Sequence, residues 1–324
     1  MEESFQRKTI SFYRYFYLEN PQEFRDSIFR NWFMLDCFGR IYVASEGINA
    51  QMSVPEHLFE AFMKTLEKYE ILNGIPIKYA IEDDGKSFYK LTIKLRPKLV
   101  ADGLDDDAYD VTNIGKHLSG IEFHNQIGKE NTVLVDMRNY YESEIGRFEG
   151  AICPVADTFR EELEMVTDLL ENKKDQKILL YCTGGIRCEK ASAFLKHKGF
   201  IDVNQLHGGI LEYARQINAA NLESKFIGKN FVFDDRLGES VNGQIISRCH
   251  QCGKPCDTHT NCANHGCHIL FIQCPDCAEK YSCCCTSDCA EDLTKGNSKI
   301  KKVIFGNSRK YRKSLTLIKT QQSV

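Results

Sequence analysis

The stretch of this chain best suited to chemistry places two cysteines and an arginine around a pair of glycines. Its members, in chain order, are Cys182, Thr183, Gly184, Gly185, Ile186, Arg187 and Cys188. The glycines let the backbone curl so that its N–H groups point at the sulfur of Cys182. The charge of Arg187 and a predicted helix N-terminus near Cys188 both favour an anion. We therefore predict that Cys182 ionises more readily than a free thiol, and that Cys182, Arg187 and Cys188 are the catalytic residues.

The length of this loop indicates which anion it holds. Cysteine-dependent phosphatases place an arginine six positions after the nucleophile, whereas Arg187 comes five positions after Cys182. The ring is one residue too small for phosphate and suits a lone thiolate or a persulfide. A buried structural cysteine at a strand end is the plainer alternative. That alternative explains neither the glycine pair nor the arginine.

Apolar patterns predict the elements that position the loop. An apolar strand over residues 177–181 leads into Cys182, and an amphipathic helix follows from about Cys188 to a cap at Gly199. A second buried strand, residues 132–138, ends in Asp136 and Arg138, which we expect to support the site. With the motifs at 146–152 and 206–210, these segments resemble the rhodanese domain over residues 125–222. That resemblance implies a mostly parallel α/β fold and a cysteine that carries sulfane sulfur as a persulfide.

The first hundred residues are predicted to form a separate domain. Strand patterns at 9–18, 40–45, 48–54 and 88–95 alternate with two helices, one beginning at Asn20-Pro21 and one at Pro55. The order strand, helix, strand, strand, helix, strand indicates a ferredoxin-like, acylphosphatase-like α+β sandwich. Residues 101–124 are expected to be an acidic linker and lead-in, because the five aspartates from Asp102 to Asp110 favour solvent.

Eleven of the fifteen cysteines fall in the region 223–294, where spacing predicts metal sites. Cys249, Cys252, Cys274 and Cys277 form two pairs with the spacing of tetrahedral zinc sites. Further candidate ligands for a second site are Cys256, Cys262, Cys267, Cys284, Cys285 and Cys289, with His250, His259, His265 and His268 in reserve. We expect structural zinc; an iron–sulfur cluster or a redox-active thiol set is the alternative.

Composition bounds the location and the partners. The sequence shows no basic, apolar leader at Met1 and no apolar run near the roughly 20 residues of a membrane span. We therefore expect a cytoplasmic protein without membrane contact, in which cysteines serve catalysis or metal binding. The net charge is −3, yet residues 295–324 hold nine Lys and Arg and no acid. This basic tail is predicted either to bind RNA or to be a solubilising extension.

Three motifs together resemble one bacterial family. They are Ala44-Ser45-Glu46-Gly47-Ile48-Asn49-Ala50-Gln51-Met52-Ser53, then Thr158-Phe159-Arg160-Glu161, and the loop from Tyr181 to Ala191, followed by the cysteine block. The family is the oxygen-dependent tRNA uridine hydroxylases, which form 5-hydroxyuridine at the wobble position. The resemblance implies action on the anticodon region of tRNA, with O2, a reductant from an unidentified electron donor, and Cys182 as the key residue.

Two other functions remain open at this point. The residues of the loop alone favour a rhodanese-type sulfurtransferase that carries a persulfide on Cys182. A non-catalytic RNA-binding module would explain the cysteine pairs and the basic tail but leaves the loop unused. No flavin or nicotinamide motif is visible. Under the hydroxylase interpretation, one hypothesis is that the Cys182 thiolate adds to C6 of uracil and makes C5 electron-rich, while Cys188 acts in redox recycling.

Overall fold

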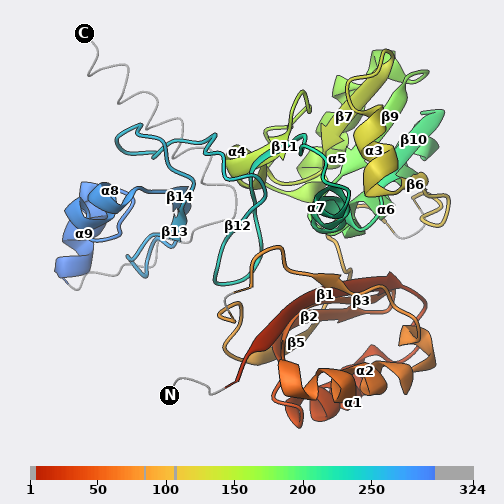
Figure 1. The fold of residues 1–324 in the computed structure, drawn as a ribbon, viewed down its shortest axis with the longest axis horizontal. Coiled ribbons are helices and arrows are strands. Elements are labelled where there is room, and N and C mark those ends of the chain that lie inside the picture. Colours follow the sequence, from red (N-terminus) through yellow and green to blue (C-terminus); the bar gives the residue numbers. More distant parts are fainter. Residues whose placement is uncertain (1–4, 84, 106–107, 296–324) are drawn as a thin grey trace.

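The structure is a computed structural model that describes residues 5–83, 85–105 and 108–295. Figure 1 shows an N-terminal sheet with helices, a central α/β domain and a C-terminal region of short elements. The basic tail predicted for 295–324 lies, apart from Lys295, outside the described residues. No helix in the described part of the chain is long and apolar enough to cross a membrane.

The first domain is a five-stranded sheet with two helices on the face turned away from the central domain (Figure 1). Its elements are β1 (Arg7–Tyr15), α1 (Pro21–Phe33), β2 (Phe38–Ala44), β3 (Gly47–Pro55), a 3-10 turn (Glu56–Leu58), α2 (Phe59–Glu67), a 3-10 turn (Glu70–Leu72), β4 (Lys78–Tyr79) and β5 (Leu91–Leu95). The strand order is β4-β1-β3-β2-β5. Strand β1 is antiparallel to both β3 and β4, and β2 is parallel to β5. The predicted ferredoxin-like sandwich is confirmed.

One strand assignment was wrong. Residues 88–95 were predicted to be the fourth strand of the sandwich, but β5, which occupies the end of this range, lies at the opposite edge of the sheet, beside β2. The position beside β1 is taken by β4, which pairs Tyr79 with Ile10 and Lys78 with Ser11. A two-residue strand has too few positions to show an alternating pattern, so β4 left no signal in the sequence.

Alternation along β1 determines what each face of the first sheet presents. Ile10 and Phe12 are buried against the helices, where the α1 stripe of Phe24, Ile28 and Trp32 packs. Asn20 caps α1 by accepting a hydrogen bond from the Glu23 N–H at 3.2 Å. Because successive side chains of a strand point to opposite faces, Tyr13 and Tyr15 face the central domain.

The central domain is a parallel sheet with helices on both faces, as predicted. Its elements are β6 (Lys116–Leu118), α3 (Gly120–Gln126), β7 (Thr132–Asp136), α4 (Tyr140–Ile145), β8 (Gly146–Phe148), α5 (Phe159–Leu169), a 3-10 turn (Glu171–Lys173), β9 (Lys177–Tyr181), α6 (Ile186–His197), β10 (Asp202–Leu206) and α7 (Gly209–Ala219). The strand order is β6-β10-β9-β7. Alternate residues of β9 enter two different apolar clusters, so this strand is buried on both faces and delivers Cys182 at its carboxyl end.

The C-terminal region begins as an extension of the central domain. Strand β11 (Phe226–Asn230) pairs with β8 on one side and with β12 (Glu239–Ser240) on the other. The remaining elements are β13 (His259–Asn261), β14 (Leu270–Ile272), α8 (Pro275–Lys280) and α9 (Ser287–Thr294). Cysteines dominate the two small clusters of buried side chains here, which contain few large apolar residues.

The acidic segment departs at Asp102 from the solvated linker that was expected, whereas Asp105 and Asp110 are exposed. Asp102 is only 2% exposed, and its carboxylate accepts hydrogen bonds from Lys98 and Lys190, each at 3.0 Å. Because Lys190 belongs to α6, its ion pair with Asp102 holds this segment against the central domain, near the Cys182 loop. Composition predicted exposure to solvent for Asp102, but one of its two cationic partners, Lys190, lies 88 positions away in the chain.

Candidate active site and metal centres

The Cys182 loop curls around its sulfur as predicted. The Gly185 N–H donates a hydrogen bond to Cys182 Sγ at 3.1 Å, immediately before α6 begins. Gly185 has φ of +102°, and a Cβ there would lie 2.8 Å from the hydroxyl oxygen of Tyr13. Position 185 therefore requires glycine both for its backbone conformation and for the close approach of the first domain.

The surroundings of Cys182 stabilise its thiolate. Complete burial on its own raises the pKa of Cys182, but the thiol of Cys188, the charge of Arg187 and the N–H groups at the start of α6 outweigh it and lower that pKa to about 6. Burial and the neighbouring Cys182 thiolate raise the pKa of Cys188 well above its ordinary value. At neutral pH the pair therefore holds one thiolate, on Cys182, and one thiol, on Cys188.

Arg187 is held in place by a carboxylate. Its two terminal nitrogens donate to both oxygens of Glu142, at 2.5 and 2.9 Å, and Glu142 is fully buried. The Thr183 hydroxyl also donates to Glu142, at 3.4 Å. Glu142 is the third residue of α4 and accepts from the Asn139 N–H in a capping box. Arg187 thus anchors the loop to α4 while its charge still favours the thiolate.

Asp136 and Arg138 lie beneath the loop and contact neither its sulfur nor Arg187. They form a fully buried ion pair, with Arg138 Nε and Nη2 donating to Asp136 at 2.8 and 2.6 Å. The Tyr181 hydroxyl donates to the same carboxylate at 2.8 Å. These contacts fix the end of β7 against the end of β9, the strand that presents Cys182. The supporting role in the site expected for Asp136 and Arg138 stays a prediction.

Sequence reasoning missed one buried acid beside the loop. Glu162, on α5, is fully buried, and neither of its oxygens has a hydrogen-bond partner in the described part of the chain. Burial raises its pKa well above the ordinary value, while the charge of Arg187 opposes that shift. The motif of residues 158–161, which ends just before this acid, forms the start of α5. Its Thr158 hydroxyl caps the helix by accepting a hydrogen bond from the Glu161 N–H at 3.3 Å. Nothing in the one-dimensional pattern distinguishes Glu162 from a solvated helix residue.

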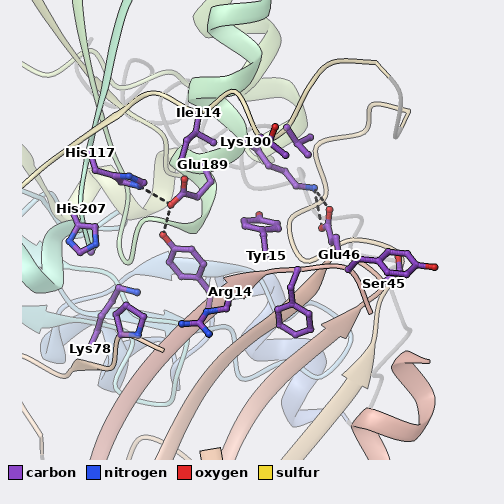
Figure 2. Close-up of a pocket in the computed structure, with 17 residues that line it drawn as sticks. Arg14, Tyr15, Ser45, Glu46, Lys78, Ile114, His117, Glu189, Lys190 and His207 are labelled. Carbon is purple, nitrogen blue, oxygen red and sulfur yellow. Dashed lines mark hydrogen bonds and ion pairs between the residues drawn. The ribbon is translucent and has the colours of Figure 1, made fainter. Parts of the chain in front are cut away.

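A pocket of about 750 Å³ lies between the first sheet and residues of the central domain that include Glu189 and Lys190 of α6 (Figure 2). Its lining includes Tyr13, Tyr15 and Lys78 of the first domain and His117, Glu189, Lys190 and His207 of the central domain. Glu189 accepts from the Tyr13 hydroxyl at 2.9 Å and from Gln205 at 3.1 Å, and it contacts His117 Nε2 at 3.0 Å. The hydrogen bond to Glu189 is the main cause that raises the pKa of His117.

The two separate motifs that carry the family resemblance meet at this pocket. Glu46, from the motif at 44–53, forms an ion pair with Lys190, from the motif at 181–191, at 3.0 Å. Glu189, in the second motif, holds Tyr13 of β1. Each motif therefore contributes one side of the contact between the domains, and the thiolate loop is built against the first sheet.

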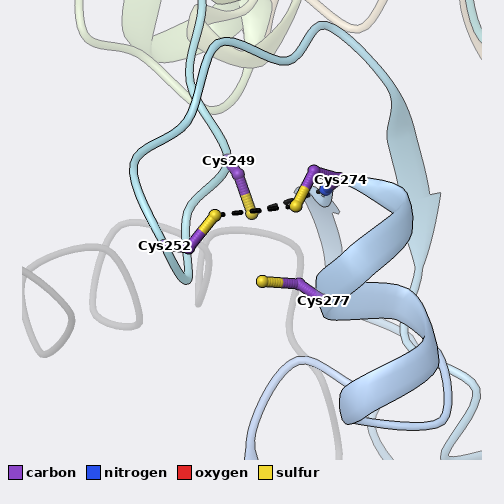
Figure 3. Close-up of side chains that lie close together, drawn as sticks. All are labelled: Cys249, Cys252, Cys274 and Cys277. Atoms are coloured by element: carbon purple, nitrogen blue, oxygen red, sulfur yellow. Dashed lines mark hydrogen bonds between the residues drawn. The ribbon is translucent and has the colours of Figure 1, made fainter.

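The cysteine region contains two groups of four thiols that could hold a metal ion. The first is Cys249, Cys252, Cys274 and Cys277, which converge on one point (Figure 3), with all sulfurs within 4.8 Å of one another. Cys252 Sγ and Cys274 Sγ are 3.6 Å apart. Zinc–sulfur bonds near 2.3 Å in a tetrahedron require sulfurs about 3.8 Å apart, so these residues fit such an ion.

The second group is Cys262, Cys267, Cys285 and Cys289, also within 4.8 Å of one another. Cys285 Sγ lies 3.7 Å from the sulfurs of both Cys267 and Cys289. The candidates Cys256 and Cys284 belong to neither group. Among the reserve histidines, His250 contacts Glu144 at 2.8 Å and is not part of either group. The ligand pairing was not derivable from spacing, because the groups interleave along the chain.

Comparison with known proteins accounts for most of the chain. Residues 7–99 match the UPF0176 acylphosphatase-like domain, residues 120–216 the rhodanese-like domain, and residues 227–290 the rhodanese C-terminal family. Among solved structures, a rhodanese-like domain protein from Staphylococcus aureus aligns with 30% of this chain and 90% of its own, at 23% identity and a TM-score of 0.26.

Curated relatives are much more similar. The tRNA uridine(34) hydroxylase of Leptospira interrogans serovar Lai is 57% identical over 94% of this chain and 83% of its own length. The tRNA uridine(34) hydroxylase of Salmonella newport is 51% identical over 90% of this chain and 84% of its own length. At this level of identity and coverage, the chain belongs to the tRNA uridine(34) hydroxylase family.

Proposed function

We propose that this protein is an enzyme that hydroxylates the wobble uridine of tRNA at C5, giving 5-hydroxyuridine. The observation that carries the proposal is 57% identity over 94% of the chain to a relative named tRNA uridine(34) hydroxylase. O2 supplies the oxygen atom and an external reductant supplies electrons. The substrate contact is with the anticodon region of tRNA, in the cytoplasm.

Cys182 is proposed as the residue that acts on the base. A thiolate can add to C6 of uracil, so that an S–C6 bond forms and the electrons of the C5–C6 double bond move toward C5 and O4. After the hydroxyl group is in place on C5, loss of the C5 proton and of the thiolate from C6 breaks the S–C6 bond and restores the double bond. The lowered pKa of Cys182, about 6, favours the thiolate needed for this addition. Because Cys182 is 0% exposed, a base can reach its sulfur only after the part of the protein that covers the loop has moved. Cys188, a neighbouring thiol, is proposed as the redox partner of Cys182.

A rhodanese-type sulfurtransferase that carries a Cys182 persulfide is the second candidate. The observation in its favour is the rhodanese-like match over residues 120–216, together with a loop too short for phosphate. It is the weaker candidate, since a general sulfur carrier gives no account of the relatives' name or of their similarity through the first domain and the cysteine region.

Zinc is proposed as the ion of both four-cysteine groups. Four thiolates at tetrahedral distances suit zinc, and such sites stabilise segments with few apolar residues. Here the metal would be structural, joining β13, β14, α8 and α9 to the rest of the region. No step of the proposed reaction passes through it.

The test of function is nucleoside analysis of tRNA from a bacterial strain that lacks its own wobble-uridine hydroxylases. Expression of this chain should restore 5-hydroxyuridine, measured by liquid chromatography and mass spectrometry. Cys182→Ser should restore none, whereas Cys153→Ser, a half-buried cysteine of the same domain, should behave like the unchanged protein. Full restoration by Cys182→Ser would contradict the role of Cys182, and accumulation of a thiolated uridine would favour the sulfurtransferase.

A further inference from the structure

Lys78 is a buried residue whose ammonium group forms no hydrogen bond with a carboxylate of the described residues, and it lies beside the Cys182 loop. Its side chain is on β4 of the first domain, and the residue is 8% exposed. Its ammonium nitrogen lies 4.3 Å from the centre of the Tyr13 ring. Among the described residues, no carboxylate or carbonyl oxygen accepts a hydrogen bond from it. An ammonium group that lines a pocket and forms no hydrogen bond with a carboxylate is a suitable donor to an anionic ligand.

The position of Lys78 connects that charge to the reactive loop. Its Cδ lies 4.0 Å from where a Cβ of Gly184 would be, and its Cε lies 3.7 Å from the equivalent point of Gly208. Gly184 is in the Cys182 loop and Gly208 precedes α7. Burial lowers the pKa of Lys78 to about 8, and the Cys182 thiolate and the carboxylates of Glu189 and Glu212 oppose that shift. An anion bound at Lys78 would therefore sit directly beside the thiolate loop and keep the lysine charged.

Several other charged groups of the pocket have partners, among them Arg14, which donates to the carbonyl oxygens of Ile71 and Asn73. Lys190 is neutralised by Glu46 and Asp102, and Glu189 is held by Tyr13, His117 and Gln205. Much of the remaining lining is aromatic, with Tyr15, Phe16 and the exposed Tyr17 following Tyr13 along the chain. Unpaired bases of RNA stack on such rings, and a volume of about 750 Å³ lies within the usual range for small-ligand sites.

We propose that this pocket binds one unpaired nucleotide of the RNA substrate, with a backbone phosphate on Lys78 and the base among the aromatic side chains. The inference rests on the proposed function and adds to it a site that the first domain contributes. Lys78 is a substrate-binding residue in this account. The first domain thereby becomes part of the active site, because β4 supplies the cation and β1 the rings.

A charge-neutralisation cycle tests the phosphate contact. The probe is a fluorescent anticodon stem-loop RNA with uridine at position 34, in which single loop linkages are replaced by uncharged methylphosphonates. Binding is measured by anisotropy for the full-length protein and for Lys78→Gln, Lys78→Arg and Lys64→Gln. Lys64 is the matched control, because it is an exposed lysine of α2 on the opposite face of the same sheet.

The expected result is that Lys78→Gln weakens binding roughly tenfold or more, as loss of a charge-assisted contact would. It should also lower the slope of log K against log salt by about 0.7, the share of one phosphate of a single strand. A methylphosphonate at one linkage next to uridine 34 should weaken binding to the unchanged protein by the same factor as Lys78→Gln does. The same methylphosphonate should not weaken binding to Lys78→Gln any further. Lys78→Arg should retain most of the affinity, and Lys64→Gln should match the unchanged protein.

Equal RNA affinity of Lys78→Gln and Lys64→Gln would overturn the inference. It would also be overturned if, at every linkage, a methylphosphonate weakened binding to Lys78→Gln by the same factor as binding to the unchanged protein. Thermal unfolding of each variant checks that Lys78→Gln is folded, and retained affinity in Lys78→Arg separates loss of charge from loss of structure. If coupling is found but the unchanged protein forms no 5-hydroxyuridine, the proposed function fails and the binding site stands. If 5-hydroxyuridine forms without coupling, only the Lys78 site fails.

Discussion

Replacing Cys188 by alanine should raise the pKa of Cys182 and make its reactivity appear at higher pH. Burial is the largest influence on Cys182 and raises its pKa, yet the pKa is about 6 against an ordinary 9.0, because the Cys188 thiol, Arg187 and backbone N–H groups outweigh burial. A hydrogen bond to a charged group is worth roughly 1.5 to 3 kcal/mol, or about one to two pKa units. Cys188→Ala should therefore bring the pKa of Cys182 to roughly 7 to 8.

The consequence is largest near pH 6, where Cys182 in the unchanged protein is half ionised. A thiolate forms only above its pKa, so at pH 6 the variant should hold roughly one tenth to one hundredth of its Cys182 as thiolate. The rate of alkylation at pH 6 should fall about fivefold to fiftyfold, while the rate at pH 9 stays nearly the same.

The assay is pulsed alkylation by iodoacetamide from pH 5 to 9, followed by trypsin and mass spectrometry. Arg187 lies between the two cysteines, so trypsin releases Cys182 and Cys188 in different peptides and each is followed alone. Cys153→Ala is the control, because Cys153 belongs to the same domain but does not contribute to the lowered pKa of Cys182. If Cys188→Ala kept the midpoint near pH 6, the hydrogen bond from Cys188 would not be what stabilises the thiolate.

Three further predictions concern the supporting structure. Because the folded pKa of Glu162 is raised, its contribution to stability is complete below the ordinary carboxyl pKa of 4.5 and is lost as pH rises toward the raised value. Glu162→Gln should gain up to about 1.4 kcal/mol per pH unit over the unchanged protein as pH rises above that ordinary value, and a constant difference in unfolding free energy would contradict this. Asp136→Asn leaves Arg138 buried without its counter-charge and should cost about 3 to 5 kcal/mol in urea unfolding, so a loss below about 1 kcal/mol would refute the importance of the pair. Elemental analysis should find two zinc ions per chain, with one lost in Cys277→Ser and the other in Cys267→Ser; an unchanged metal content in either variant would contradict the assigned groups.

The sequence was sufficient for features that depend on local pattern. The curl of the Cys182 loop, the strand before it and the helix after it follow from neighbouring residues, and the structure places them where spacing predicts. The cap of α1 at Asn20 and its stripe of Phe24, Ile28 and Trp32 are equally local. Each of these features is set within about ten residues of chain, where helix and strand periodicity can be read directly.

Features that depend on contacts between distant segments were missed. Lys78 lies in a two-residue strand whose partner is β1, and the burial of Glu162 is set by the packing of α5 under the loop. Asp102 belongs to an acidic run, but a lysine of α6 holds it inside the protein. Composition gives the charge and polarity of a segment. Its burial depends on which other part of the protein packs against it. The two four-cysteine groups are a further example, because their members alternate along the chain. Spacing identifies two cysteines that bind one ion together, but it does not identify the other two ligands of that ion.

The domain contacts change how the Cys182 loop is understood. From its own residues it is a thiolate cradle of the rhodanese kind, able to serve sulfur transfer. In the structure, Tyr13 and Lys78 of the first sheet lie against it, and Glu46 and Tyr13 hold the first turn of α6. The first domain therefore covers the loop and contributes aromatic side chains to the pocket beside it.

The most direct test of the central claim is the origin of the atom added to uridine 34. Purified protein, unmodified tRNA and a chemical reductant are incubated under 18O2, and the wobble nucleoside is analysed by mass spectrometry. We predict one 18O atom on the uracil ring with the unchanged protein and with Cys153→Ser, and none with Cys182→Ser. A sulfur atom on the base, oxygen derived from water, or full 18O incorporation by Cys182→Ser would contradict the account.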